Sequence, residues 1–185
     1  MLDKVFPKIH QEGYKFLIIA ILITIVLYFV SNFLGLICVV LTIWVYYFFR
    51  DPERISINDE NYLVSPADGL VLDVSEKKGP KELGLENKNF KKISIFMNVF
   101  DCHVNRSPCA GKISEIFYKP GKFINASLDK SSEDNERNYY KIINKQGNEI
   151  VVVQIAGLIA RRIVCEASKD QELDQGSRIG MIRFG

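Results

Sequence analysis

The sequence predicts a mainly β body, of the barrel or sandwich kind, with a hydrophobic helical hairpin at its N-terminal end. Three observations predict this fold. Residues 16–49 contain no charged side chain. The residues after position 50 fall into short segments rich in Val, Ile, Phe and Tyr, which is typical of strands. Glycines separate these segments, and helical periodicity is weak there. We therefore divide the chain into a membrane-associated hairpin at 1–50 and a β-rich domain at 51–185.

The uncharged run is too long for a single membrane span. As one helix it would be about 51 Å long, whereas the hydrocarbon core of a bilayer is about 30 Å thick. Ser31 and Asn32 interrupt the run, which leaves apolar helices at 16–30 and 33–49. These lengths favour a tight hairpin that dips into the bilayer or just crosses it. A signal peptide is disfavoured because no small-residue cleavage site follows the run.

Basic residues flank the run on both sides, with Lys4, Lys8 and Lys15 before it and Arg50 and Arg54 after it. A hairpin places both flanks on one side of the membrane, and the positive-inside rule makes that side cytoplasmic. We therefore expect the body on the cytoplasmic face of the cell membrane. The alternative is a helix pair buried in a soluble core, but the rest of the chain is too small to cover such a pair on all sides.

Charge and cysteine patterns exclude several function classes. Four of the 24 basic and two of the 22 acidic residues lie in 1–50, so the remainder carries 20 of each and no net charge. A neutral body argues against nucleic acid as a partner. The four cysteines are scattered and form no cluster with zinc spacing, so we expect no metal site and a reducing compartment.

The strand candidates follow one another along the body. They lie at 69–75, 92–99, 111–118, 139–144, 149–155 and 161–167, and a last strand follows Gly180. Residues 145–148 predict a hairpin turn between two of them. The polar stretch 125–138 is too long for a tight turn and predicts a loop, functional or simply mobile.

Few residues in this sequence could carry chemistry. The chain has two histidines, and we expect His10, which precedes the uncharged run, at the surface. His103 closes an apolar strand, a position from which a side chain can enter a cleft, although a structural role is the alternative. Asp68 precedes a glycine in a sequence that also suits an ordinary turn. The chain stops at Gly185 within an apolar strand, as if it were cut short or a further segment had once been attached.

Seven short motifs, in order, give the sequence its resemblance to a known family. They are 49–52 (FRDP), 65–69 (SPADG), 100–106 (FDCHVNR), 120–126 (PGKFINA), 135–137 (NER), 159–163 (IARRI) and 180–185 (GMIRFG). Each motif is weak alone, but together they are specific and cover nearly the whole chain. The sequence resembles the processed β chain of a short-form phosphatidylserine decarboxylase.

The resemblance implies both an activity and a processing event. Members of this family are proenzymes that cut themselves at a Gly-Ser bond, and Gly185 matches that glycine. The serine becomes a pyruvoyl group on a small α chain, which would be the partner of this chain, and a homodimer of such αβ units is one assembly that the resemblance allows. Through a Schiff base with phosphatidylserine, the pyruvoyl group acts as an electron sink, and the products are phosphatidylethanolamine and CO2.

The resemblance also assigns roles to residues of the body. An acid must protonate Cα after decarboxylation, and His103 is the histidine placed to do so. Asp68 matches an Asp that assists the serine in longer members, together with a His. The family motif there has two histidines, of which the first aligns with His103 and the second with Arg106, so a strict Asp-His-Ser triad is not reproduced. Either His103 serves both self-cleavage and decarboxylation, or Asp68 activates the serine through another group. Arg106 and Arg137 are candidates for binding the substrate carboxylate and phosphodiester.

Two rival functions stay open at the level of sequence. A decarboxylase that acts on serine attached to an archaeal ether lipid would use the same residues. A non-enzymatic, membrane-tethered barrel-sandwich module would show the same strand and glycine pattern. A carrier module of that kind would have a modifiable Lys at a hairpin tip between small apolar residues, and the tip at 146–148 lacks this arrangement.

Overall fold

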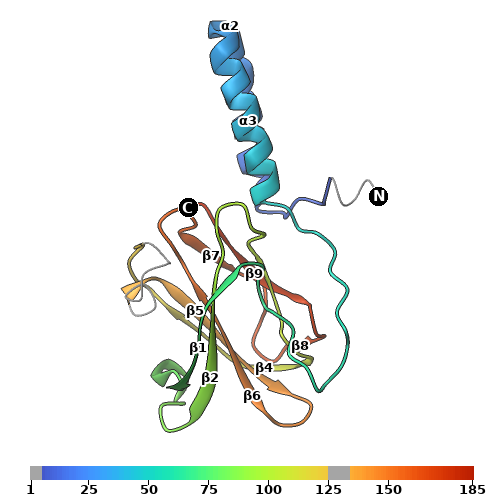
Figure 1. Cartoon of the computed structure of the whole chain (residues 1–185), viewed down its shortest axis with the longest axis vertical. Helices are drawn as coiled ribbons and strands as arrows, with labels where there is room; N and C mark the ends of the chain where they lie inside the picture. The colour runs from blue at the N-terminus through green and yellow to red at the C-terminus, as the bar shows by residue number, and fades with distance from the viewer. Residues whose placement is uncertain (1–5, 125–133) are drawn as a thin grey trace.

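The computed structural model describes residues 6–124 and 134–185, and it confirms a mainly β body below a helical hairpin (Figure 1). The described elements are α2 (Gly13–Val30), α3 (Asn32–Phe48), β1 (Leu70–Lys78), the 3₁₀ turn η1 (Lys81–Leu83), β2 (Asn89–Phe96), β3 (Val104–Arg106), β4 (Gly111–Lys119), β5 (Arg137–Asn144), β6 (Glu149–Ile155), β7 (Arg162–Cys165), β8 (Glu172–Leu173) and β9 (Arg178–Arg183). From the base of the hairpin, residues 51–69 run down the side of the body without regular secondary structure before β1 begins (Figure 1).

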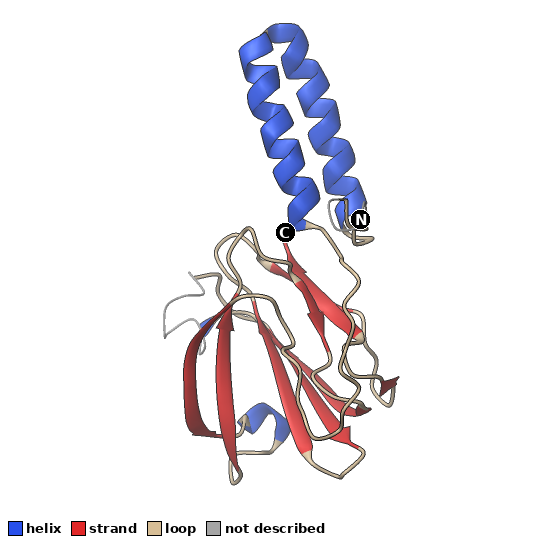
Figure 2. Ribbon diagram, turned by 45° about the vertical axis from the view of Figure 1, so that its right-hand side comes forward, coloured by secondary structure: helices blue, strands red, loops and turns tan. Residues whose placement is uncertain are grey.

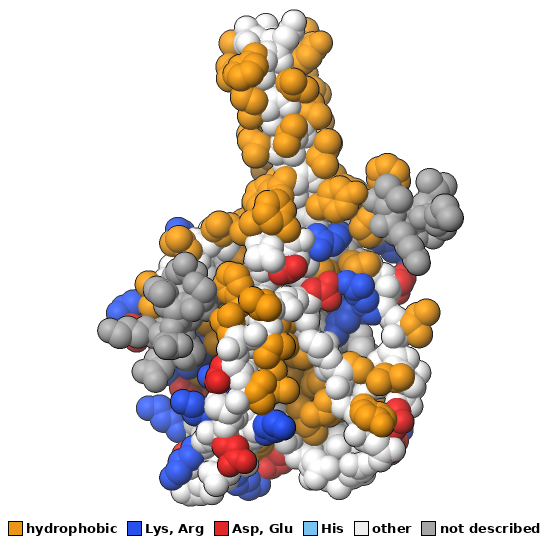
Figure 3. Space-filling view, viewed as in Figure 1, with side chains coloured by type: hydrophobic (Ala, Val, Ile, Leu, Met, Phe, Trp, Pro, Cys, Tyr) orange, Lys and Arg blue, Asp and Glu red, His pale blue; other side chains and the backbone are white. Residues whose placement is uncertain are grey.

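The hairpin breaks where the sequence predicts it. Ser31 alone separates the helices, with an extended backbone (φ −161°, ψ 128°). The two helices run side by side (Figure 2), and the hydroxyls of Thr24 and Thr42 lie 2.8 Å apart between them. At the standard rise, α2 is about 27 Å long, close to the thickness of a hydrocarbon core. Apolar side chains cover the visible face of the hairpin (Figure 3), so the body does not bury it as a soluble core would.

Three antiparallel sheets form the body. The strand orders are β1-β2, β3-β9-β7 and β6-β5-β4-β8. One buried cluster, which includes Ile113, Tyr140 and Ile179, lies between the four-stranded and three-stranded sheets. A second, which includes Leu83 and Tyr139, lies beneath the 3₁₀ turn and β2. This layered arrangement is that of a small β sandwich.

A third cluster joins the hairpin to the body. Phe48 and Phe49, at the end of α3, pack with Cys102, Val104 and Met181 of the body. Phe48 and Phe49 are each 1% exposed, whereas most side chains higher in the helices are on the surface. The hairpin is therefore continuous with the core of the body at its base and exposed above it.

The strand prediction is correct in type and less accurate in its boundaries. β6 occupies the predicted range and the turn at 145–148 is present, with φ +82° at Gly147. The short strands β3 and β8 were not predicted, because two or three residues carry no periodic pattern. Residues 125–133 of the predicted loop lie outside the described residues, and Arg137 and Asn138 belong to β5 rather than to a loop.

The prediction of a surface position for His10 is wrong. The residue is 5% exposed, and its Nε2 lies 2.6 Å from Oε1 of Glu166. Its Nδ1 accepts a hydrogen bond from the backbone N–H of Glu12 at 3.3 Å. The chain before α2 folds back along residues 49–51, through backbone bonds such as that from the N–H of His10 to the carbonyl of Phe49 at 2.8 Å. This packing, which no local pattern signals, buries the imidazole.

Candidate active site

The last strand brings the end of the chain next to His103. β9 is the central strand of its sheet, between β3 and β7. Val104 is paired with Met181, and the backbone N–H of Ile182 donates to the carbonyl of His103 at 3.2 Å. His103 therefore lies across the ladder from the residues that lead to Gly185. In Figure 2 the C-terminus is just below the lower end of the hairpin.

His103 is not at the end of the apolar strand, as predicted, but at the start of the next one. β2 ends at Phe96, and a turn follows in which the N–H of Asn98 donates to the Asp101 carboxylate at 2.9 Å. This turn directs the chain back into β3. The imidazole does not emerge into an open cleft, because it is 3% exposed and stacks on the ring of Phe48 with 4.3 Å between centroids.

The surroundings of His103 determine its protonation. Nδ1 lies 3.1 Å from the carbonyl oxygen of Asp101, which can only accept, so Nδ1 carries the hydrogen. Burial lowers the pKa of His103 below 6.5, and the positive charge of Arg50 lowers it further, although the contacts with Asp101 oppose this shift. At neutral pH the ring is therefore uncharged. Its Nε2 keeps a lone pair and has no hydrogen-bond partner among residues 6–124 and 134–185, so the site contains a base.

Phe184, between β9 and Gly185, sits in an aromatic cluster. Its ring stacks on Phe48 at 4.0 Å and on Trp44 at 5.4 Å between centroids. Phe48 therefore lies in contact with both His103 and Phe184. The indole of Trp44 also donates to the carbonyl of Val99 at 3.2 Å, which ties α3 to the turn before His103. Trp44 and Phe48 of α3 thus form one wall of the site.

Asp68 lies near the site without touching His103. Its carboxylate is paired with the guanidinium of Arg54 and is more than one-third exposed. Burial, together with the negative charge of Asp68, raises the pKa of the Cys102 thiol, so this charge acts on the residue next to His103. Within the described part of the chain, no hydrogen bond joins Asp68 to His103. Arg54, which sequence analysis used only as a membrane flank, thus belongs to the surroundings of the site.

Arg106 is largely occupied by the body itself. Its guanidinium donates to the carbonyls of Gly176 at 3.0 Å and Pro52 at 2.9 Å, and to the Asp51 carboxylate at 3.1 Å. The Asp51 carboxylate also accepts a hydrogen bond from Nε of Arg178 at 2.6 Å. This network fastens the chain that leaves the hairpin onto the three-stranded sheet. The contacts are those of a structural residue, and they do not include His103.

Arg137 is buried at the beginning of β5. Its Nε donates to the carbonyl of Asn135 at 3.2 Å, and its Nη1 donates to the hydroxyl of Tyr139 at 3.0 Å. Arg137 is 9% exposed, so it is not on the outer surface. The hydrogen bonds described above join it to Asn135 and Tyr139 and not to His103. The structure therefore places His103 beside Ile182 of β9, on the strand that leads to Gly185, and among the described residues neither arginine has a hydrogen bond to His103.

A surface groove lined by Arg54, Ser56, Gln146 and Gln175, among others, has a volume of about 550 Å³, but neither His103 nor Gly185 lines it. No group of three or more His, Cys, Asp or Glu residues in the described ranges could hold a metal ion.

Comparison with known proteins identifies the family. The family model for phosphatidylserine decarboxylase matches residues 41–185. A phosphatidylserine decarboxylase proenzyme of Pelagibacter ubique is 80% identical over the whole chain, which covers 86% of that protein. The proenzymes of Ruegeria pomeroyi and Cereibacter sphaeroides are 52% and 50% identical over the whole chain, which covers 84% and 80% of them. The chain therefore belongs to the phosphatidylserine decarboxylase family.

Proposed function

We propose that this chain is the β chain of a phosphatidylserine decarboxylase, released by cleavage after Gly185, and that it converts phosphatidylserine to phosphatidylethanolamine and CO2. The observation that carries the proposal is the position of His103, a buried neutral base opposite the strand that leads to Gly185. The family supplies the reaction, and the proenzyme names of the relatives agree with a chain made by processing.

His103 acts first as a base in self-cleavage. Its Nε2 takes the proton of a serine hydroxyl that follows Gly185, and the serine oxygen bonds to the Gly185 carbonyl carbon while the peptide nitrogen leaves with a proton. The resulting ester then breaks by elimination, in which the serine Cα loses a proton and Gly185 leaves as a free carboxylate; water then hydrolyses the remaining enamine to the pyruvoyl carbonyl and ammonia is released. Asp68 is kept as a candidate to assist the serine through another group, because its carboxylate is paired with Arg54 and forms no hydrogen bond with His103 among the described residues.

His103 acts next as a proton carrier in decarboxylation. A pyruvoyl group on the α chain supplies the electron sink that decarboxylation at Cα requires. The low pKa of His103 means that it does not begin as an acid. It first takes a proton from the substrate ammonium group, which must lose protons to react, and then returns that proton to Cα once CO2 has left. Its apolar surroundings, with Phe48 on one face, keep competing water away.

The end of β9 fits a small group in this position. A Cβ atom at Gly185 would lie 2.7 Å from Cβ of Arg162, so the position suits a residue without a side chain. Arg162 is exposed and adjacent, and its cationic head can attract the substrate carboxylate or phosphodiester. We also propose Arg106 and Arg137 as residues that bind the substrate carboxylate or phosphodiester, although each already donates hydrogen bonds to groups of the body.

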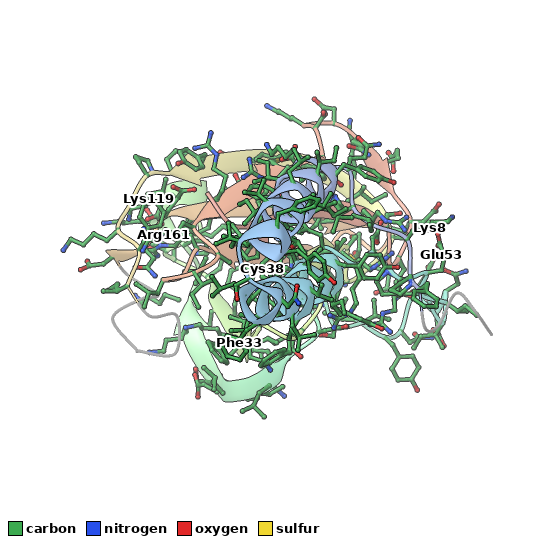
Figure 4. The ribbon with its side chains drawn as sticks, turned by 90° about the horizontal axis from the view of Figure 1, so that it is seen from above. Lys8, Phe33, Cys38, Glu53, Lys119 and Arg161 are labelled. Atoms are coloured by element: carbon green, nitrogen blue, oxygen red, sulfur yellow. The ribbon has the colours of Figure 1, made fainter. Side chains whose placement is uncertain are left out.

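We propose that the apolar hairpin holds the site at a membrane, where a phospholipid substrate is found. We assign it to the cytoplasmic face of the cell membrane on the basis of the basic flanks. Phe100 and the turn at Leu158 and Ile159 are more than half exposed. Phe100 and this turn both lie near the end of α3. The guanidinium of Arg50 donates to the carbonyl of Phe100 at 2.8 Å, and Ala160, next to Ile159, packs against the cluster that contains Phe48. Figure 4 shows the hairpin above the middle of the body, with Arg161 to one side. These apolar tips meet the bilayer beside the helices.

The partners proposed are the small pyruvoyl-containing α chain, a membrane phospholipid and a second αβ unit. Phosphatidylserine is favoured over an archaeal ether lipid because the relatives described above are bacterial proteins named for phosphatidylserine.

The test is to express the proenzyme with the segment that follows Gly185 and to supply vesicles containing phosphatidylserine. We expect a polypeptide whose mass corresponds to a chain ending at Gly185, and release of CO2. A protein that stays uncut, or is cut elsewhere while decarboxylation proceeds, would contradict the assignment of Gly185.

A further inference from the structure

The chain leaves the sheet just before Gly185, and the hairpin contacts the residues at this point. The β7-β9 pairing ends with Arg162 opposite Arg183, so the ladder does not extend to Phe184 and Gly185. What fixes this segment instead is contact with residues from the beginning of the chain. We call these residues the hairpin base: Glu12, Phe16, Trp44, Phe48 and Phe49.

The aromatic members of the hairpin base enclose the ring of Phe184. Phe48 and Trp44 stack on it, and Phe16 and Phe49 meet it edge-on at 5.7 Å and 5.2 Å between centroids. These four rings come from both helices and from the residue that follows α3. A ring held on several sides loses most of its freedom, and this fixes the peptide that carries it.

A charged contact fixes the same segment from another direction. Nε of Arg183 and Oε2 of Glu12 form an ion pair 2.8 Å apart that is shielded from solvent, and their alignment is not that of a hydrogen bond, so the contact acts through charge. Nη1 of Arg183 donates to the carbonyl of Phe184 at 2.5 Å, which is the carbonyl of the peptide joining Phe184 to Gly185. The Arg183 guanidinium also lies over the ring of Phe16 at 5.4 Å. Glu12 therefore orients a guanidinium that in turn orients the peptide next to the proposed cut.

Simple docking of the hairpin would not require this arrangement. Other contacts already attach the hairpin to the body, among them the bond from Trp44 to Val99 and the pairing of His10 with Glu166. Attack of a hydroxyl on a neighbouring carbonyl requires the reacting atoms to lie about 3–3.5 Å apart in the correct orientation. The segment next to Gly185 is the part of the chain that must be held to this tolerance.

We propose that the hairpin base is a clamp that positions the Gly185 peptide for self-cleavage, so that the hairpin serves maturation as well as membrane attachment. This inference rests on the proposed function, since it assumes the cut after Gly185. Glu12 and Arg183 are its positioning residues. His103 remains the base.

The experiment measures the rate of self-cleavage in the membrane-bound proenzyme. Glu12→Gln removes the charge that orients Arg183 and keeps the shape of the side chain, and we expect cleavage to slow about tenfold or more. Glu12→Asp, which keeps the charge, should recover part of the rate. The matched control is Glu53→Gln, since Glu53 forms exposed ion pairs with Lys8 at 3.4 Å and with Arg178 at 3.5 Å, and Figure 4 shows Lys8 and Glu53 to one side of the hairpin. This control should be cut at the wild-type rate.

Each outcome decides one question. Wild-type proenzyme that is not cut after Gly185 defeats the proposed function itself. Wild-type proenzyme that is cut, together with a Glu12→Gln variant cut equally fast, overturns the clamp and leaves the proposed function intact. If Glu12→Gln does not fold, as judged by thermal unfolding, Arg183→Lys decides instead. That variant keeps the pair with Glu12 but lacks the fork that reaches the Phe184 carbonyl, so slow cleavage supports the clamp and a wild-type rate overturns it.

Discussion

Replacing His103 in two different ways separates its chemistry from its packing. His103→Ala removes both the nitrogen atoms and the ring that stacks on Phe48. Truncation of a large buried side chain costs about 2–5 kcal/mol, and an aromatic pair contributes about 0.5–1.5 kcal/mol beyond burial. We expect the free energy of unfolding to fall by about 3 kcal/mol. His103→Phe keeps a ring on Phe48 and should lose only about 1 kcal/mol, mainly from the unpaired carbonyl of Asp101.

Both variants should lose the chemistry to a similar extent. A general acid or base contributes about 10²–10⁴-fold in rate, or about 2.7–5.4 kcal/mol in activation free energy. The assays are the rate of self-cleavage of the proenzyme on a gel, the release of CO2 from phosphatidylserine vesicles, and thermal unfolding. If His103→Phe is cut and turns over lipid within a few-fold of wild type, His103 is only a packing residue and the mechanism proposed above is wrong.

Three further predictions concern pH, the Asp51 network and the membrane. Because burial lowers the pKa of His103 below 6.5, the neutral form of the imidazole persists below that pH. The rate of self-cleavage should therefore stay constant from neutral pH down to 6.5 and fall only in more acid solution. A pH-rate profile in which the rate already falls above pH 6.5 would exclude His103 as the base. Asp51→Asn leaves Arg106 and Arg178 without their shared carboxylate, which is 12% exposed. We expect the free energy of unfolding, measured by denaturant titration, to fall by about 2–4 kcal/mol. An unchanged midpoint of that titration would count against the network. An environment-sensitive dye on Ile159→Cys should shift to the blue when the protein is in vesicles, whereas the same dye on Ile93→Cys, an exposed position of β2, should not.

Local pattern in the sequence was enough to predict much of the fold. The break at Ser31, the range of β6 and the turn at Gly147 each depend on a few consecutive residues, and the structure confirms them. His103 and Gly185 could also be identified from short stretches of sequence. His103 is the one histidine of residues 51–185, and Gly185 ends a motif of the family. The predicted boundaries of β2 were less accurate, because the turn that follows this strand contains apolar residues like those of the strand itself.

Contacts between distant parts of the chain were decided only by the tertiary structure. Phe184 meets Phe48 because β9 lies between β3 and β7, and His10 is buried because the chain before α2 pairs with the residues after α3. Arg106, a candidate for the substrate from its motif, is instead committed to Asp51. Periodicity along a chain reports which face of an element is buried, but not which distant residue buries it. That partner depends on strand order and register, and here these bring the beginning of the chain to its end.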